Sequence, residues 1–231
     1  MATKAQAQAE LELRRRRRDR TTLASLGIID FVPAVSPEFQ RPSHLGPLGV
    51  ELDRVDHEEI RLCCHTPPRH GKTETLLHLI TRTLMRRPEC RIGYATYSAD
   101  LAEAKSNKAR RKARSLGVDI VTDQAKEWRT SAGGGLLARG VGGGWTGRGL
   151  DLLIVDDPIK DRKEAESKAT RKGILDWYAD AAYTRLMPGS SVVVNMARWH
   201  ELDLIGSLIK DGYPYLRLPA ICDDTSDPLG R

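Results

Sequence analysis

The sequence predicts an α/β fold in which helices cover both faces of a mainly parallel central sheet. Three observations lead to this prediction. Strand-like and helix-like segments alternate along the 231 residues. A short apolar segment, a glycine-containing loop and an amphipathic segment follow one another over residues 60–86. A second apolar segment, over residues 151–157, ends in two carboxylates. The chain is long enough for one sizeable core and too short for two ordinary domains.

The composition argues against a membrane or secreted protein. The sequence contains no run of about 18 apolar residues, so no membrane span is expected. The first 20 residues lack the apolar segment of a secretory signal. The four cysteines, at positions 63, 64, 90 and 222, do not have metal-site spacing. The adjacent pair lies in an apolar run, which indicates buried, reduced thiols of a cytosolic protein.

The positive charge is concentrated at the N-terminus. The chain has 37 Lys and Arg against 31 Asp and Glu residues, a net charge of +6. Residues 1–20 alone hold seven basic and three acidic residues. We therefore predict a basic, flexible arm over 1–20. A contact to nucleic acid phosphates or to an acidic partner surface is the alternative, and composition does not choose between them.

The first half of the remaining chain contains the clearest elements. Residues 21–59 look irregular because four prolines, at positions 33, 37, 42 and 47, interrupt any long helix. Residues 60–65 then predict a buried strand, and 72–86 carry leucine and isoleucine at helical spacing. Residues 91–97 predict a second strand, and Ser98 is placed to cap a helix over 99–115 that Gly117 ends.

Charge and glycine mark the next two segments. Residues 105–114 hold six Lys or Arg residues, which predicts an exposed helix face, with DNA contact as the alternative. Nine of the 17 residues over 133–149 are glycine, as in a linker, yet a buried strand over 151–157 follows at once. We expect a helix over about 164–183, a strand over 191–195, a helix after Asp203 and a last strand near 215–218.

The segment TPPRHGKTE matches the end of the phosphate-loop pattern G-x-x-x-x-G-K-[ST], but Thr66 stands in place of the first glycine. In such a loop, backbone N–H groups at a helix N-terminus bind phosphate oxygens. Lys72 would reach the β- and γ-phosphates, and the Thr73 hydroxyl would ligate Mg²⁺. Arg69 would contact phosphate within the same chain. The candidate nucleotide-binding residues are Thr66, Pro67, Pro68, Arg69, His70, Gly71, Lys72, Thr73 and Glu74.

The strand LLIVDD supplies the second half of a nucleotide site. Asp156, at the carboxyl end of a buried strand, is the residue type that holds Mg²⁺. Asp157 would orient or deprotonate the attacking water, although the pair Asp157-Pro158 also suits the start of a turn. The strand and helix over 91–115 come between the two motifs. This order predicts a P-loop NTPase of the additional-strand class, also called RecA-like or ASCE.

Polar residues outside these motifs are further candidates. Asn195 and Arg198, at the end of the strand expected beside the phosphate-loop strand, are candidate γ-phosphate sensors. Arg139 and Arg148, in the glycine-rich segment, are candidate arginines that act on a neighbouring subunit in a ring. Ordinary surface roles are the alternative for both. Residues 39–41 (Phe-Gln-Arg) are the guess for the segment that reads the adenine base.

Four segments together resemble the large terminase subunit of tailed bacteriophages: PPRHGKT, TYSADLAEAKS, TGRGLDLLIVDDP and RLMPGSSVVVNMARWHELDL. The likeness runs from about residue 30 to the end. The resemblance implies an ATP hydrolase that uses ATP and Mg²⁺ to drive double-stranded DNA into a procapsid. It also implies a ring on the portal protein, a small terminase subunit as partner, and a place in the host bacterial cytoplasm during virus assembly. The ring is expected on the procapsid, and the isolated chain could be a monomer.

The resemblance also assigns roles to residues. It gives phosphate and Mg²⁺ binding to Lys72 and Thr73, Mg²⁺ to Asp156 and the catalytic carboxylate to Asp157. Many motor ATPases have glutamate at the last position, so the shorter side chain changes the distance to the water. The coupling motif of the family commonly reads TRWH. Because Ala197 replaces its threonine, the role of that hydroxyl is absent or falls to Asn195 or Arg198.

By the same resemblance, 21–220 would be the ATPase domain and 221–231 the start of a linker to a nuclease domain that this chain lacks. No nuclease activity is therefore expected. One alternative function is another P-loop DNA translocase or helicase-like ATPase, which would need a second RecA-like domain. The other is a nucleic-acid-binding module with an inactive ATPase site. The intact Lys72, Thr73, Asp156 and Asp157 argue against an inactive site.

Overall fold

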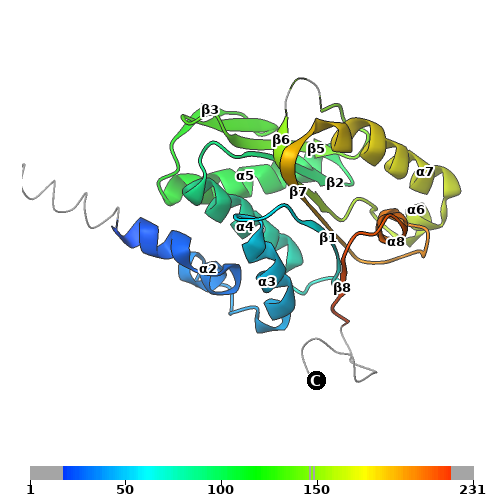
Figure 1. Ribbon diagram of the computed structural model, residues 1–231, viewed down its shortest axis with the longest axis horizontal. Coiled ribbons are helices and arrows are strands. Elements are labelled where there is room, and N and C mark those ends of the chain that lie inside the picture. The colour runs from blue at the N-terminus through cyan, green and yellow to red at the C-terminus, as the bar shows by residue number, and fades with distance from the viewer. Residues whose placement is uncertain (1–17, 146, 148, 220–231) are drawn as a thin grey trace, which may run out of the picture.

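The computed structural model describes residues 18–145, 147 and 149–219. Its centre is an eight-stranded sheet with the order β3-β4-β5-β2-β6-β7-β1-β8 (Figure 1). All pairs from β5 to β8 are parallel, and β3 and β4 are antiparallel to their neighbours. The strands are β1 (Arg61–His65), β2 (Arg91–Thr96), β3 (Ile120–Asp123), β4 (Glu127–Thr130), β5 (Gly135–Gly140), β6 (Leu150–Asp156), β7 (Leu186–Met196) and β8 (Tyr215–Arg217). The predicted α/β class is confirmed.

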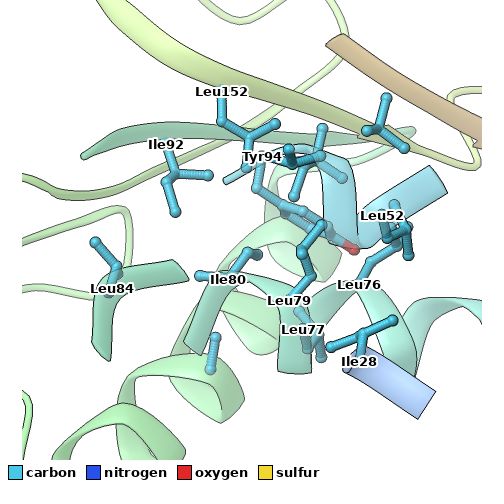
Figure 2. Packing of buried hydrophobic residues seen from close by; sticks show 14 of the residues in the cluster. Ile28, Leu52, Leu76, Leu77, Leu79, Ile80, Leu84, Ile92, Tyr94 and Leu152 are labelled. Carbon is cyan, nitrogen blue, oxygen red and sulfur yellow. The ribbon is translucent and has the colours of Figure 1, made fainter. Parts of the chain in front are cut away.

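Helices cover both faces of this sheet. One side carries α4 (Lys72–Arg86) and α5 (Ala99–Ser115), with α2 (Ile28–Val35) and α3 (Gly46–Arg54) beside α4 (Figure 1). The other side carries α6 (Arg162–Glu166), α7 (Lys168–Trp177) and α8 (Leu204–Lys210). Side chains of β6 alternate between the two cores, as a strand buried on both faces requires. Leu152 and Ile154 enter the first core, where Figure 2 shows Leu152 above Tyr94 of β2, and Leu153 and Val155 enter the second.

The strand between the two nucleotide motifs is β7. It pairs with β1 on one side and with β6 on the other, over residues 192–196 and 191–195. The sequence expected the strand over 191–195 beside the phosphate-loop strand, which is confirmed, whereas the segment 91–97, which lies between the two motifs along the chain, pairs with the opposite edge of β6. Order along the chain does not give order in space. The arrangement, with one strand between the phosphate-loop strand and the aspartate strand, is that of the additional-strand P-loop class.

Several predicted elements need correction. Residues 21–59 are not irregular: they hold helical residues up to 25, then α2, the short 3-10 helix η1 (Ser43–Leu45) and α3. Pro47 lies in the first turn of α3, where its missing N–H costs nothing. Part of the glycine-rich segment is the strand β5. The single helix expected over 164–183 is divided at Ser167 and continues after α7 as a π-helix (Tyr178–Ala182) and a 3-10 turn (Tyr183–Arg185).

Other expectations are confirmed. The helices α4 and α5 begin and end where the sequence placed them, and the Ser98 hydroxyl accepts from the N–H of Leu101 at the α5 N-terminus. Cys63, Cys64 and Cys90 are buried free thiols, and burial raises the pKa of each to about 12. Cys222, nearly all of the basic arm and the linker segment 221–231 lie outside the described residues. Within the described ranges, no helix is long and apolar enough to cross a membrane.

Candidate nucleotide and magnesium site

The loop between β1 and α4 has the geometry of an anion site. Two of its residues have positive φ, Arg69 at 64° and Gly71 at 80°, and Gly71 is the N-cap of α4. Glycine adopts this conformation freely, whereas an arginine there is strained. The backbone N–H groups of Gly71, Lys72 and Thr73 find no acceptor among the described residues. Unpaired donors at a helix N-terminus suit phosphate oxygens.

Contacts from the N-terminal helices hold this loop. A ring nitrogen of His44, in η1, lies 2.9 Å from the carbonyl oxygen of His70. The ring of His70 turns back on its own loop, with Nδ1 2.9 Å from the Pro68 carbonyl oxygen. Pro68 and Arg69 are exposed, and Pro67 is half-buried. Both contacts end on backbone carbonyl oxygens of the predicted loop, so they fix the path of its backbone.

Asp156 ends β6 at this edge and is only 2% exposed. Its Oδ2 accepts from the hydroxyls of Thr73 (2.7 Å) and Tyr94 (3.0 Å), and its Oδ1 accepts from Nδ2 of Asn195 (3.3 Å). All three donors are neutral. Burial raises the pKa of Asp156, and the charge of neighbouring Asp157 raises it further. A buried carboxylate beside a threonine hydroxyl is a donor set that suits Mg²⁺.

Asp157 turns away from its strand. Its φ is 47°, a conformation that aspartate tolerates better than most residues. The neighbouring strands hold its backbone: its N–H donates to the carbonyl of Asn195 (2.9 Å) and its carbonyl accepts from the N–H of Tyr97 (3.1 Å). Its carboxylate accepts from Nζ of Lys72 (2.5 Å) and from the backbone N–H of Ala197 (3.1 Å). Residue 197 therefore contacts Asp157 through its backbone N–H, so alanine can make this contact as well as the threonine of the usual motif.

The position of the missing first glycine is occupied by a bonded threonine. Thr66 is fully buried, and its Oγ1 donates to Oδ1 of Asn195 over 3.0 Å. Asn195 is also fully buried and donates onward to Asp156. Thr66, a predicted loop residue, is thus linked through Asn195, a predicted sensor residue, to Asp156, which would hold the metal.

Glu74 lies in the first turn of α4 and connects this helix to α5. Its Oε1 is 2.6 Å from Nζ of Lys108, which also lies 5.2 Å from the ring centre of Phe39. The Phe39 ring in turn packs edge-on against His78. In the guessed base-reading segment 39–41, Phe39 therefore packs against α4 and α5, while Arg41 bonds Asp30 and Ser43. Four of the six basic residues over 105–114 bond within the chain: Lys108 to Glu74, Arg110 and Arg114 to Asp123, and Lys112 to Ser36.

Of the candidate arginines, Arg198 and Arg139 are described, and neither bonds Asp156 or Asp157. Arg198 donates through Nε to Asp203 (2.7 Å), whose other oxygen accepts from Gly206 N–H at the α8 N-terminus. Arg139 lies in β5 rather than in a loop, which corrects the sequence reading. Its guanidinium donates to the carbonyls of Lys126, Ala138 and Gly144. Arg148 lies outside the described residues, so its role stays a prediction.

Two aromatic residues of the site region were missed by sequence reasoning. Tyr94 is fully buried and bonds Asp156 from the neighbouring strand β2. Trp145, which is 2% exposed, anchors the glycine-rich segment by packing against Gly93 and Trp177. Alternation along RIGYATY indicates which face Tyr94 occupies, but the contact depends on the pairing of β2 with β6, which a single sequence does not give.

The sheet order, the loop before α4 and the paired aspartates together define a P-loop NTPase of the additional-strand class. Residues 63–228 match the family described as terminase large subunit, T4likevirus-type, N-terminal. This match covers more than half of the chain, and the chain therefore belongs to that family. The resemblance inferred from the four sequence segments is confirmed.

Solved structures with a partial likeness include two phage terminases and a DNA packaging motor. The large terminase from a thermophilic bacteriophage, in complex with ATP-gamma-S, is 14% identical over 70% of this chain and 39% of its own, with a TM-score of 0.43. The large terminase ATPase domain of Thermus phage P74-26 is 14% identical over 64% of this chain and 63% of its own, with a TM-score of 0.40. The Phi-28 gp11 DNA packaging motor is 12% identical over 85% and 64%, with a TM-score of 0.39.

The chain thus spans about two fifths of the first of these proteins and under two thirds of the other two. Among curated proteins, none matches the chain.

Proposed function

We propose that this chain is the ATPase motor domain of a viral DNA-packaging terminase, which couples Mg-ATP hydrolysis to the movement of double-stranded DNA into a procapsid. One observation carries the proposal: Lys72, Thr73, Asp156 and Asp157 meet at one edge of the sheet in a terminase-family chain. A ring on the portal protein, a small terminase subunit as partner and assembly in the host bacterial cytoplasm belong to the same proposal.

The phosphate-binding part consists of the loop backbone and Lys72. The N–H groups of residues 71–73, which have no acceptor in the part of the chain that the structure describes, lie at a helix N-terminus and would bind phosphate oxygens. The Lys72 ammonium bonds Asp157 and is 6% exposed at its side chain. When phosphate binds, this ammonium would exchange the carboxylate for phosphate oxygens. Lys72 therefore connects nucleotide binding to the release of Asp157.

The metal part consists of Thr73 and Asp156. Bound Mg²⁺ would supply positive charge to the phosphate oxygens. The residues fit that ion because a buried carboxylate with three neutral donors gains from a cation, and because Thr73 can donate to Asp156 while its oxygen binds a metal. Asp156 and Thr73 come from different elements, so holding the metal also holds α4 against β6.

The residue for water activation is Asp157. Its side chain is 33% exposed, in contrast to buried Asp156, so water reaches it. The N–H of Ala197 keeps one of its oxygens in place after Lys72 leaves. The freed carboxylate would then accept a proton from, or orient, the attacking water. Two adjacent aspartates thus take two different tasks.

The test is nucleotide binding and hydrolysis in parallel. We expect wild type to bind ATP with Mg²⁺ and to hydrolyse it. Lys72→Ala should lose binding, because the loop loses its cation. Asp157→Ala should keep binding and lose about 10²-fold or more in rate. Lys210→Ala, which changes an exposed lysine on α8, is the matched control and should behave as wild type.

Two results would overturn the proposal. Hydrolysis by Asp157→Ala at the wild-type rate would remove the carboxylate from the mechanism. Wild type that fails to bind Mg-ATP at all would remove the nucleotide site itself.

A further inference from the structure

Four buried polar side chains form a row across the sheet at the edge of the nucleotide site. They come from four neighbouring positions in the order β1-β7-β6-β2. Each is at most 2% exposed. They are Thr66 directly after β1, Asn195 in β7, Asp156 at the end of β6 and Tyr94 in β2. Buried polar groups are costly unless bonded, so a continuous row of them needs a reason.

Hydrogen bonds run inward from both ends of the row to Asp156. From one end, Thr66 donates to Asn195 over 3.0 Å, and Asn195 donates to Oδ1 of Asp156 over 3.3 Å. From the other end, Tyr94 donates to Oδ2 over 3.0 Å. An ionised carboxylate only accepts. Asn195 must therefore turn its NH₂ group to Asp156 and its oxygen to Thr66. The Thr66 hydroxyl is then the donor to Asn195 and the first group in this series of hydrogen bonds.

We propose that Thr66 and Tyr94 are positioning residues of the nucleotide site, which hold the Asp156 carboxylate from two sides in the orientation that binds Mg²⁺. This inference rests on the proposed function. Neither residue would touch the metal: Tyr94 acts on Asp156 directly, and Thr66 acts through Asn195. Groups bonded to a metal ligand orient it and typically change metal affinity by 10- to 100-fold when they are removed.

The bond from Thr66 to Asn195 gives a physical reason why this loop has threonine in place of the usual first glycine. Glycine at position 66, the residue of the usual pattern, has no hydroxyl to donate to Asn195. The buried oxygen of that amide would lose its partner, and one side of Asp156 would loosen. Restoring the usual motif by Thr66→Gly should therefore weaken the metal site instead of improving it.

The experiment titrates Mg²⁺ while the binding of ATP-gamma-S is followed by calorimetry, with no hydrolysis needed. The variants are Thr66→Val, which keeps the shape and removes the hydroxyl, Thr66→Ser, which keeps the hydroxyl, and Tyr94→Phe. The matched controls are Thr130→Val and Tyr178→Phe. Both delete a hydroxyl that bonds elsewhere in the fold, to the Pro88 carbonyl and to the Tyr213 hydroxyl.

For Thr66→Val and Tyr94→Phe we expect the half-saturating Mg²⁺ concentration to rise about tenfold. Binding of ATP-gamma-S without Mg²⁺ should change less than about twofold, because the loop N–H groups and Lys72 are untouched. Thr66→Ser should restore the wild-type Mg²⁺ dependence. Both controls should match wild type. A merely structural role would lower the melting temperature without moving the Mg²⁺ concentration, so thermal melting is recorded for every variant.

Folded variants with the wild-type Mg²⁺ dependence would overturn the inference and leave the proposed function intact. Wild type without any Mg²⁺-dependent binding of ATP-gamma-S would overturn the proposed function and this inference with it. Tyr94→Phe removes a single oxygen atom, so it carries the test even where a substitution at position 66 prevents folding.

Discussion

Asp156 and Asp157 are adjacent and chemically identical, but their different burial gives them different environments. Asp156 stays in the strand, is buried, and receives three neutral donors, while burial raises its pKa. Asp157 leaves the strand through a positive φ, lies closer to solvent and receives a charged donor, Lys72. Environments that differ in this way let neighbouring carboxylates do different chemistry. Under the proposed function, Asp156 would hold the metal and Asp157 would meet the attacking water.

The buried position of Asp156 predicts a conflict between stability and function. A carboxyl whose pKa is raised by folding binds its proton more tightly in the folded state, so its ionised form at pH 7 weakens the fold. Asp156→Asn removes this charge and keeps one side-chain oxygen that can accept from Thr73 and Tyr94. We expect the free energy of unfolding in urea, without Mg²⁺, to rise by about 1 kcal/mol. Stabilisation by Mg-ATP should disappear.

A fall in stability for Asp156→Asn would show that its hydrogen bonds outweigh the cost of its burial. Lys72→Ala in the same titration is the control for lost nucleotide binding with the carboxylate retained.

His78 predicts a pH dependence of stability. Burial lowers its pKa below 6.5, and the charges of Lys112 and Lys108 lower it further, although the Glu74 backbone and side chain oppose this. The unfolded state then binds more protons, so the stabilisation is present above pH 6.5 and is lost as the pH falls below it. We expect wild type to lose about 1 kcal/mol more between pH 7.5 and 5.5 than His78→Gln does. Urea unfolding at both pH values measures this.

His65, whose pKa burial also lowers, would provide the slope that remains in His78→Gln. Equal slopes in the two proteins would contradict the prediction.

The sequence was sufficient for residues whose role belongs to a local motif, and insufficient where strands must be paired first. Lys72 and Thr73 follow from the loop pattern and the helix after it, and Asp156 follows from the strand that it ends. The contact of Tyr94 with Asp156 exists only because β2 lies beside β6. The link from Thr66 to Asn195 requires β1 beside β7. No local pattern encodes these pairings.

At the scale of elements, strong periodicity and caps predicted α4, α5 and β6, while weak signals failed. The helix α2 was missed because Pro33 lies inside it; the helix tolerates the lost hydrogen bond because it buries Ile28 and Phe31. The strands β3 and β4 have four residues each and are partly exposed, too short for a clear alternation. The strand β5 was missed because the glycine content of its segment is typical of a linker. Its backbone nevertheless pairs with β2.

A glycine inside β2 predicts how the glycine-rich segment is anchored. A Cβ at position 93 would lie 2.5 Å from the ring of Trp145 and 2.7 Å from Leu150. Gly93→Ala should therefore displace Trp145 and cost about 1–3 kcal/mol in unfolding free energy. Tryptophan fluorescence should shift to longer wavelength as this ring meets water. Gly173→Ala is the control, since its Cβ would meet open space on α7. Unchanged emission from Gly93→Ala would remove Trp145 as the anchor.

At the scale of the molecule, the candidate site is open along the edge where β1, β7 and β6 end. Two of the described candidate arginines are bonded within the chain: Arg198 to the start of α8 and Arg139 to three backbone carbonyls. Of the six basic residues of α5, three form ion pairs within the chain and a fourth bonds Ser36. Their charge therefore supports the fold of this chain and leaves less for an external DNA phosphate than the sequence count suggests.

These commitments lead to a prediction about assembly. In a ring, a neighbour would supply an arginine to the developing charge, and Arg148 is the remaining candidate because Arg139 is bonded within its own chain. The rate of ATP hydrolysis per chain should then rise with protein concentration. Arg148→Ala should lower the high-concentration rate at least about tenfold with ATP binding retained. Arg139→Ala should keep the rise and lose stability, and Arg162→Ala, with a 78% exposed side chain, should match wild type. A rate independent of concentration and unaffected by either arginine would mean a self-contained ATPase with no arginine from a neighbour.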